Sequence, residues 1–374
     1  MLIKRNLQPI LEKWLFKGKI LIMYGARQVG KTTLLKEILK KHTNGDGYFD
    51  CEIISVRRAL EKQDPAVLKN FLGNHKIIAL DEAQKVLNIG LSLKLLIDTY
   101  PDLQIIATGS SSFDLANKIN EPLTGRALEF PLFPLSLDEL SQVYRRYEVD
   151  SQLPFFLTFG MYPGIIKAGQ NGARVLLDNL SGQYLYKDVL EFENLKRSTL
   201  LLNLLQLLAL QIGNEVSINE LAVTLQCGRD TVWRYLDLLE KSFVIFRLRA
   251  FSRNLRKEIG KKQKIYFYDL GIRNSLINQY NSLELRNDVG ALWENFCVVE
   301  RMKHLQNIER SAGLYFWRTH DQKEVDYLEE YNGKLEGFEF KWNKDSFQPP
   351  KDFLSYPNSS VSLVNKHNYQ EFLM

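Results

Sequence analysis

Cysteine is scarce in this sequence, and that scarcity limits the kinds of fold and site it can form. Only three cysteines occur in 374 residues (Cys51, Cys227 and Cys297), and no two of them form a CxxC pair. An odd and scattered set argues against a disulfide framework and against a thiol-ligated zinc site, and it indicates a reducing compartment. The five histidines show no metal-ligand spacing either.

Long apolar runs are also missing. The most apolar stretch, residues 200–212, contains Asn203, Gln206 and Gln211 and is too short to span a bilayer. The first residues lack the continuous apolar core of a signal peptide. We therefore expect a cytoplasmic protein without a membrane partner. The 49 Lys and Arg against 44 Asp and Glu leave a net charge of +5, which permits nucleic acid as a partner without requiring it.

What is present is an ordinary globular composition, with 45% hydrophobic and 25% charged residues. Between residues 19 and 133, short apolar runs alternate with helical patterns. Residues 19–24, 76–80 and 103–108 are continuous apolar runs of the kind buried in parallel sheets, and 32–41 reads as a helix. This alternation predicts an α/β sandwich, which we place at residues 1–145, followed by a helical connector at 146–196.

A phosphate-binding loop follows the first of these strands. Residues 25–32 read GARQVGKT and match GxxxxGK[ST] at every fixed position, directly between a strand and a helix. Backbone N–H groups of such a loop point at phosphate oxygens, and the helix N-terminus favours negative charge. We expect Lys31 to reach the β- and γ-phosphates and Thr32 to bind Mg²⁺. The predicted nucleotide-binding residues in this segment are Gly25, Ala26, Arg27, Gln28, Val29, Gly30, Lys31, Thr32 and Thr33.

Further nucleotide-site candidates follow the next strands. Asp81 and Glu82 end the strand at 76–80, so Asp81 is expected to hold Mg²⁺ and Glu82 to polarise the attacking water. Ser110 follows the third strand and either lies beside the γ-phosphate or belongs to a serine-rich turn. Arg126 is either an arginine finger for a neighbouring subunit in a homo-oligomer, a sensor in its own subunit, or a surface arginine.

A helix-turn-helix pattern occupies the middle of the chain. Apolar positions at helical spacing run from Ile218 to Leu225, break at Gly228 and resume from Arg229. Two strand-like runs follow, and residues 241–264 hold nine Lys or Arg against Glu258 alone. The arrangement resembles a winged helix with a basic wing, which we place at 197–262. It predicts either DNA contact, through Arg229, Thr231 and Arg234, or a protein–protein element.

Several strings in this order resemble one family. GARQVGKTTLL, IIALDEAQ, IIATGSSSFDL and LTGRALEFPLFPLSLDEL are similar to the AAA-type P-loop ATPases of bacteria and archaea. In that group the ATPase core precedes a characteristic C-terminal domain, which YLYKDVL, IYFYDLGIRNSL, LWENFCVVE and FWRTHDQKEVDYL resemble. The resemblance covers nearly the whole chain and implies ATP binding.

The last third of the chain carries acidic residues in a second pattern. Glu294 lies on a predicted helix, Asp326 on a strand, and Glu339 and Lys341 two apart on the next strand, so that both face one side. This order resembles the PD-(D/E)XK nuclease fold, which we place at 263–374. There the acidic groups hold Mg²⁺ and the lysine orients a water or stabilises charge on the phosphate. Glu300 is an alternative to Glu294 as the helix carboxylate.

Two functions follow from these patterns. The first is a Mg²⁺-dependent ATPase that acts at DNA, with metal-dependent cleavage by Lys341 and a second metal held by Glu294, Asp326 and Glu339. The second is a nucleotide-controlled DNA- or protein-binding module whose nuclease-like domain is catalytically degenerate. Convergence of the C-terminal carboxylates in space would favour the first.

Overall fold

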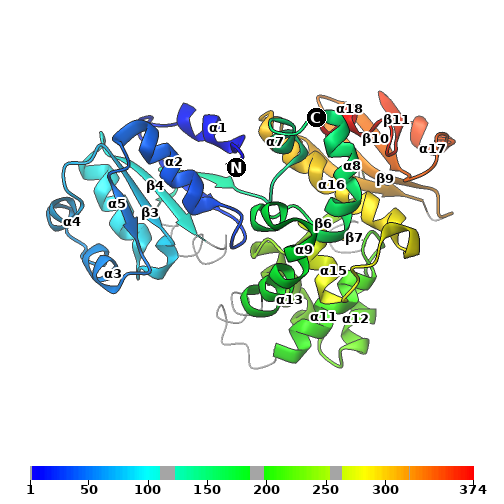
Figure 1. The fold of residues 1–374 in the computed structure, drawn as a ribbon, viewed down its shortest axis with the longest axis horizontal. Coiled ribbons are helices and arrows are strands. Elements are labelled where there is room, and N and C mark those ends of the chain that lie inside the picture. Colours follow the sequence, from blue (N-terminus) through cyan, green and yellow to red (C-terminus); the bar gives the residue numbers. More distant parts are fainter. Residues whose placement is uncertain (1, 110–122, 186–197, 253–262, 320) are drawn as a thin grey trace. The chain divides into compact units, whose positions relative to one another are not determined.

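The computed structural model describes residues 2–109, 123–185, 198–252, 263–319 and 321–374. The chain divides into two compact units (Figure 1). The N-terminal unit holds residues 2–133 and 241–243, and the C-terminal unit holds 134–240 and 244–374. The division falls at Phe133 rather than near residue 145. Residues 135–137 belong to the C-terminal unit because their backbone groups are bound by the side chains of Glu300 and Lys303.

The N-terminal unit is built around a parallel five-stranded sheet in the order β2-β3-β4-β1-β5. The three apolar runs are its central strands, because runs without polar alternation are buried on both faces. This confirms the predicted α/β fold with a parallel sheet. The strands are β1 (Ile20–Tyr24), β2 (Tyr48–Asp50), β3 (Ile77–Asp81), β4 (Gln104–Gly109) and β5 (Ala127–Pro131).

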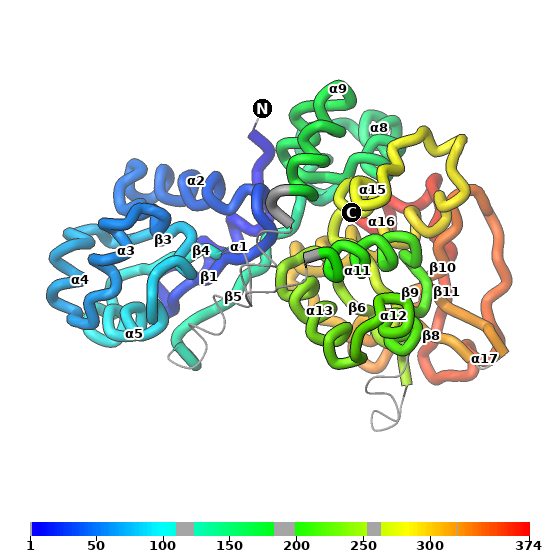
Figure 2. Tube along the Cα trace, turned by 90° about the horizontal axis from the view of Figure 1, so that it is seen from below, coloured from blue at the N-terminus to red at the C-terminus, as the bar shows by residue number. Residues whose placement is uncertain are grey.

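Helices cover both faces of this sheet, and Figure 2 shows α2 and α5 on opposite sides of it. One core combines side chains of β1, β3 and β4 with leucines of α3, α4 and α5, among them Leu60, Leu68 and Leu93. The helices are α1 (Leu7–Lys13), α2 (Lys31–Thr43), α3 (Ile54–Leu60), α4 (Pro65–Leu72) and α5 (Ile89–Thr99).

The C-terminal unit combines helices with a mixed six-stranded sheet in the order β11-β10-β9-β8-β6-β7. Its strands are β6 (Ile245–Ala250), β7 (Gln263–Phe267), β8 (Gly313–Arg318), β9 (Glu324–Tyr331), β10 (Lys334–Phe340) and β11 (Ser359–Val364). Its helices are α7 (Leu137–Ser141), α8 (Arg146–Phe159), α9 (Pro163–Asn179), α11 (Ser198–Leu210), α12 (Ile218–Thr224), α13 (Arg229–Lys241), α15 (Leu270–Leu276), α16 (Val289–Asn307), α17 (Lys351–Leu354) and α18 (Tyr369–Leu373).

The boundary expected at residues 262 and 263 separates two strands that the structure pairs. β6 and β7 are antiparallel partners, and β6 also pairs with β8 through Arg249 and Ala250. The two strands after the helix-turn-helix therefore belong to the same sheet as β8–β11. Sequence pattern identified the strands but carried no information on which strands would pair. The basic segment 253–262 lies outside the described residues.

Helix α16 positions one of the predicted acidic residues, Glu294, and is fixed at both ends. Arg301 forms two hydrogen bonds with Glu329 of β9, at 2.7 and 3.1 Å, and donates a third to the Phe372 carbonyl of α18. Asp288, directly before the helix, accepts hydrogen bonds from Arg273 at 2.6 Å and from Arg286 at 2.8 Å.

Asp288 predicts a pH-dependent part of the stability of this unit. Burial raises its pKa, but the hydrogen bonds from Arg286 and Arg273 outweigh burial and lower the pKa to about 2. A lowered carboxyl pKa adds stability that is present above about pH 3.8 and is lost as the pH falls toward 2. Because the side chain is 21% exposed, we expect Asp288→Asn to cost about 1 to 2 kcal/mol of unfolding free energy at pH 7.

Denaturant unfolding of both proteins between pH 7 and pH 3 checks this expectation, and the difference should shrink below about pH 4. Asp352→Asn is the matched control, because Asp352 pairs with Lys323 at 2.6 Å but both side chains are about half exposed. A difference that stays constant down to pH 3 would show that ionisation of Asp288 is not its source.

Cys51, Cys227 and Cys297 are all free thiols. Within the described ranges, no helix combines the length and the apolar character needed to cross a membrane.

Candidate functional site

The GxxxxGK[ST] segment forms a tight loop between β1 and α2. Gly30 has a φ of +103°, which favours glycine, and helix α2 begins at the next residue. Lys31 is only 5% exposed, and its Nζ donates to the carbonyl oxygens of Gly25 at 2.9 Å and Ala26 at 3.0 Å. The ammonium group is thus held inside the loop. Val29 is buried, Ala26 and Arg27 are half-buried, and Gln28 and Thr33 are exposed.

Asp81, at the end of β3, collects hydroxyl groups from three other elements. Its Oδ2 accepts hydrogen bonds from Thr32 and Tyr48, each at 2.7 Å, and its Oδ1 accepts one from Thr108 of β4. The Thr32–Asp81 contact joins the phosphate loop to β3 although β4 lies between β1 and β3 in the sheet. A hydroxyl and a carboxylate side by side are hard oxygen donors that suit Mg²⁺.

Glu82 follows Asp81 in a left-handed backbone conformation, with φ +53°. Its N–H donates to Thr108 Oγ1 at 3.1 Å, and its carboxylate accepts from Gln84. Since β1, β3 and β4 are parallel, their carboxyl ends share one sheet edge, so Glu82 lies on the edge where the phosphate loop lies. Ser110, the next candidate on this edge, lies outside the described residues.

Two residues of this site carried no sequence signal. Arg5 donates to the carbonyl oxygens of Val29 and Phe133, both at 2.6 Å, and so ties the phosphate loop to the chain after β5. The hydroxyl of Tyr48 donates a hydrogen bond to Asp81 Oδ2. Both residues act through contacts distant in sequence, and an isolated arginine or tyrosine belongs to no spacing motif.

Arg126 lies where β1 and β5 begin, whereas the phosphate loop lies where β1 ends. Its carbonyl accepts from the Ile20 N–H at the start of β1, and Ala127 pairs with Ile20. Gly25 follows the strand that starts there, roughly 17 Å further along at about 3.3 Å per residue. In this arrangement the Arg126 side chain does not reach the phosphate loop of its own subunit. The guanidinium pairs with Asp98 at 2.7 and 3.1 Å and is 38% exposed.

Comparison with known families agrees with this geometry. Residues 17–141 match the family model described as an AAA domain. The chain carries an AAA domain. The segments after it, 150–283 and 289–367, match two models described as domains of unknown function. The N-terminal unit is thus an AAA-type P-loop ATPase domain, followed by C-terminal regions for which those models state no function.

Two relatives align with this chain over about three quarters of their own length. An uncharacterized protein of Mycobacterium tuberculosis is 28% identical over 343 residues, which is 90% of this chain and 74% of that protein. An uncharacterized protein of Methanocaldococcus jannaschii is 29% identical over 345 residues, 85% of this chain and 74% of that one. Among solved structures, a chain of the Drosophila ORC bound to AT-rich DNA and Cdc6 aligns with 74% of this chain and with 91% of its own length. The TM-score is 0.27 and the sequence identity is 8%, so the likeness is slight.

Beyond the AAA domain, acidic side chains gather around Lys264 of β7. Its Nζ lies 2.8 Å from Glu294 Oε1 on α16, and 2.5 Å from Glu324 Oε1 and 3.8 Å from Asp326 Oδ1 on β9. The lysine side chain is only 2% exposed. In the sequence, Lys264 belongs to the basic stretch 241–264, and no spacing motif points to Glu324.

A second lysine closes the other side of this cluster. Lys341 Nζ lies 2.7 Å from Glu339 Oε1 and 3.8 Å from Asp326 Oδ2, and Asp326 Oδ2 also accepts from the Phe340 N–H. The structure thus brings Glu294, Asp326, Glu339 and Lys341 to one place. Glu300 is elsewhere, bound to the Leu137 N–H at 2.7 Å and to Lys303 at 2.6 Å.

These residues do not fit a bound divalent cation in this arrangement. In the part of the chain that the structure describes, no group of three or more His, Cys, Asp or Glu side chains is placed to hold a metal. The ammonium groups of Lys264 and Lys341 already pair with these carboxylates. Burial and the charge of Asp326 raise the pKa of Glu294 to about 7 despite its bond to Lys264, and the same two causes raise the pKa of Glu339, whose Oε2 is buried without a hydrogen-bond partner.

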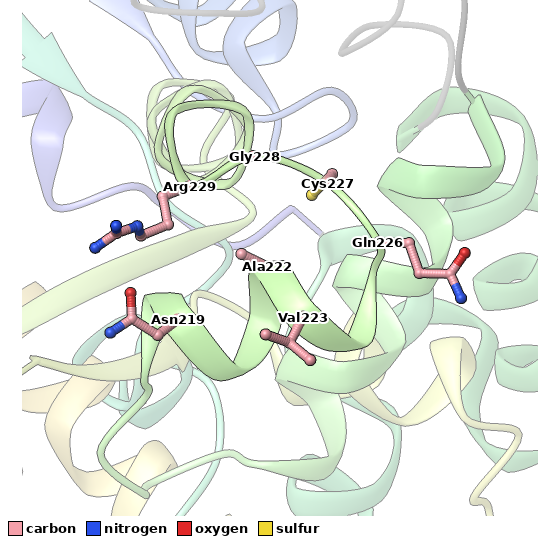
Figure 3. Close-up of a pocket in the computed structure, with 7 residues that line it drawn as sticks. All are labelled: Asn219, Ala222, Val223, Gln226, Cys227, Gly228 and Arg229. Carbon is pink, nitrogen blue, oxygen red and sulfur yellow. The ribbon is translucent and has the colours of Figure 1, made fainter.

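The helix-turn-helix candidates lie around the α12–α13 turn. Ser217 begins α12 by accepting a hydrogen bond from the Glu220 N–H at 3.3 Å. Figure 3 shows a hollow between the two helices, with Asn219 and Arg229 at one side and Gln226 at the other. It is lined by Asn219, Ala222, Val223, Gln226, Cys227, Gly228 and Arg229. On α13, Arg229 and Arg234 are exposed and Thr231 is half-buried.

The positive charge near this turn is smaller than the sequence count of nine suggested. Arg247 of β6 is bound by Asp237 and Glu240 of α13, and Lys264 is buried among carboxylates. Both residues are neutralised inside the unit, because a buried cation requires an anionic partner. The basic residues of 253–262 lie outside the described residues.

Proposed function

We propose that the AAA domain binds ATP and hydrolyses it with Mg²⁺. The observation that carries this proposal is the 2.7 Å contact between Thr32 at the end of the phosphate loop and Asp81 at the end of β3. The phosphate loop alone would indicate nucleotide binding. A carboxylate beside the loop hydroxyl, followed by Glu82, adds the groups that hydrolysis requires.

Each group has a distinct task in this proposal. The loop N–H groups and Lys31 bind the phosphate oxygens, for which Lys31 exchanges its bonds to Gly25 and Ala26. Thr32 and Asp81 would hold Mg²⁺, which neutralises charge on the phosphates. Glu82 orients a water molecule and accepts its proton. The test is release of phosphate from ATP, measured with Mg²⁺ and with EDTA. A protein that binds no ATP in the presence of Mg²⁺ would refute the proposal.

We further propose that Arg126 acts on the nucleotide of a neighbouring subunit in a homo-oligomer. Arg126 is far from the phosphate loop of its own subunit, so a catalytic role would have to be at the nucleotide of a neighbouring subunit. Turnover per subunit should then rise with protein concentration, and Arg126→Ala should abolish the rise. Asp98→Asn is the matched control, because it removes the ion pair but keeps the guanidinium. If both variants behave alike, or if the wild type is fully active as a monomer, Arg126 is structural.

For the C-terminal unit we propose DNA binding by the α12–α13 element. Arg229 and Arg234 are exposed on α13, near the helix start where major-groove contacts lie in helix-turn-helix proteins. The predicted residues Glu294, Asp326, Glu339 and Lys341 lie together, as cleavage would require, but the additional cation Lys264 pairs with Glu294 and Asp326 and would compete with a metal ion for them. We therefore favour a nucleotide-controlled binding module over a nuclease. Protein binding in the hollow of Figure 3, beside exposed Val223, is the competing outcome.

The DNA proposal predicts a salt-dependent affinity. Each phosphate contact contributes about 0.9 to the slope of log affinity against log salt concentration. Reversing both charges, Arg229→Glu with Arg234→Glu, should lower the slope by about 2 and weaken binding about tenfold or more at 0.1 M salt. The control is the equally charged pair Lys334→Glu with Lys351→Glu, at exposed positions of β10 and α17. Binding that ignores salt, or equal losses in both pairs, would contradict the proposed surface.

A further inference from the structure

In the cluster around Lys264, a lysine ammonium group neutralises the buried carboxylates. An ammonium group that is 98% removed from solvent costs several kcal/mol unless it is paired. Lys264 is paired with three carboxylates, contributed by α16 and β9. Lys303, another buried lysine of the C-terminal unit, contacts the single carboxylate of Glu300 and a carbonyl oxygen.

Several oxygen atoms of this cluster already accept hydrogen bonds or pair with a cation. Glu294 Oε1 accepts from Lys264 at 2.8 Å and from the Tyr266 hydroxyl at 2.7 Å, which together use its two lone-pair directions. Glu324 accepts from Lys264 at 2.5 Å and has Arg318 3.7 Å from its other oxygen. A metal ion would need the lone pairs that these donors hold.

We propose that the Lys264 ammonium is the permanent cation of this cluster and excludes divalent metal ions from Glu294, Glu324 and Asp326. A lysine side chain cannot dissociate from its site as a metal ion can, so the charge balance does not depend on metal supply. The same three carboxylates would bind a divalent cation once the ammonium is removed, because hard carboxylate oxygens left without a partner are ligands for hard cations. This inference is independent of the proposed ATPase function.

The experiment measures Mn²⁺ binding to the full chain without nucleotide, by the loss of free Mn²⁺ signal in electron paramagnetic resonance. Wild type, Lys264→Ala and Lys264→Arg carry the same phosphate loop, so any difference arises at the cluster. We expect Lys264→Ala to gain one Mn²⁺ site, bound about tenfold or more tighter than any site of the wild type. Lys264→Arg keeps the positive charge and should gain none.

Lys303→Ala is the matched control for removal of a buried lysine. It leaves one carboxylate rather than three, so it should be destabilised without gaining Mn²⁺ affinity. Mn²⁺ should also raise the unfolding temperature of Lys264→Ala but not that of Lys303→Ala. If Lys264→Ala does not fold, the double variant Lys264→Ala with Glu324→Gln lowers the buried negative charge and keeps two ligands. A tight Mn²⁺ site at the cluster in the wild type, or no gain in any Lys264→Ala protein, would overturn the proposal.

Discussion

Replacing Lys31 with alanine is expected to abolish ATP hydrolysis, with turnover falling about a hundredfold or more. The Gly25 and Ala26 carbonyls hold the ammonium within the phosphate loop, so it can exchange these two bonds for bonds to phosphate oxygens while it stays inside the loop. Lys36→Ala is the matched control. Lys36 lies on the same helix, is exposed, and contacts the Tyr48 ring at 4.8 Å rather than the loop.

Glu82→Gln separates binding from chemistry at the same site. The amide keeps the size of the side chain and its contact with Gln84 but cannot accept a proton from water. ATP affinity should stay close to that of the wild type while phosphate release falls about a hundredfold or more. Titration with a fluorescent ATP analogue and a phosphate-release assay measure the two quantities. Normal turnover in both Lys31→Ala and Glu82→Gln would show that ATP is not hydrolysed at this site.

The phosphate site could be predicted from sequence because its parts are local. The loop glycines, Lys31 and Thr32 lie within eight residues, and Asp81 and Glu82 directly follow an apolar strand. Arg5 and Tyr48 could not be predicted, because each reaches the site through the fold. Arg126 shows the reverse case. The sequence left three roles open for it, and the parallel register of β1 and β5, which places it at the end of the sheet away from the phosphate loop, bears only against a role at its own nucleotide.

The C-terminal unit shows where sequence patterns lose information. Spacing identified Glu294, Asp326, Glu339 and Lys341 as candidates, and these residues lie at one place in the structure. Spacing did not reveal what neutralises them. Lys264 appeared in a basic stretch that read as a surface wing, whereas its side chain is buried among carboxylates of α16 and β9. Charge counted along a sequence cannot distinguish an exposed lysine from one paired in the interior.

The first glycine of the loop is expected to be as necessary as Lys31, for a reason that the motif does not state. A Cβ on Gly25 would lie 2.0 Å from the Leu132 carbonyl oxygen and 3.0 Å from its carbon. These are backbone atoms at the end of β5, where the Leu132 N–H bonds to the Tyr24 carbonyl at 2.6 Å. Gly25→Ala must therefore displace the loop or the strand.

We expect Gly25→Ala to lower the unfolding free energy of the AAA domain by about 2 to 3 kcal/mol, the cost of overpacking that moves backbone. ATP binding should be lost with the displaced N–H groups. Gly30→Ala meets a different limit, because its φ of +103° is strained for alanine although Arg5 Nη1, at 3.6 Å, leaves room for the Cβ. It should cost about 1 to 2 kcal/mol. Gly290→Ala is the control, since no atom lies within 4 Å of its added Cβ.

Thermal unfolding followed with and without ATP distinguishes the two glycines. ATP should stabilise the wild type and Gly290→Ala, because a ligand that binds the folded state shifts unfolding to higher temperature. ATP should leave the unfolding temperature of Gly25→Ala unchanged. Gly30→Ala keeps space for the loop and should retain part of the shift. If Gly25→Ala is stabilised by ATP as strongly as the wild type, then the backbone at Leu132, just after β5, shifts to make room for the Cβ and the loop stays in place. The close approach of these two strands would then not be what requires glycine at this position.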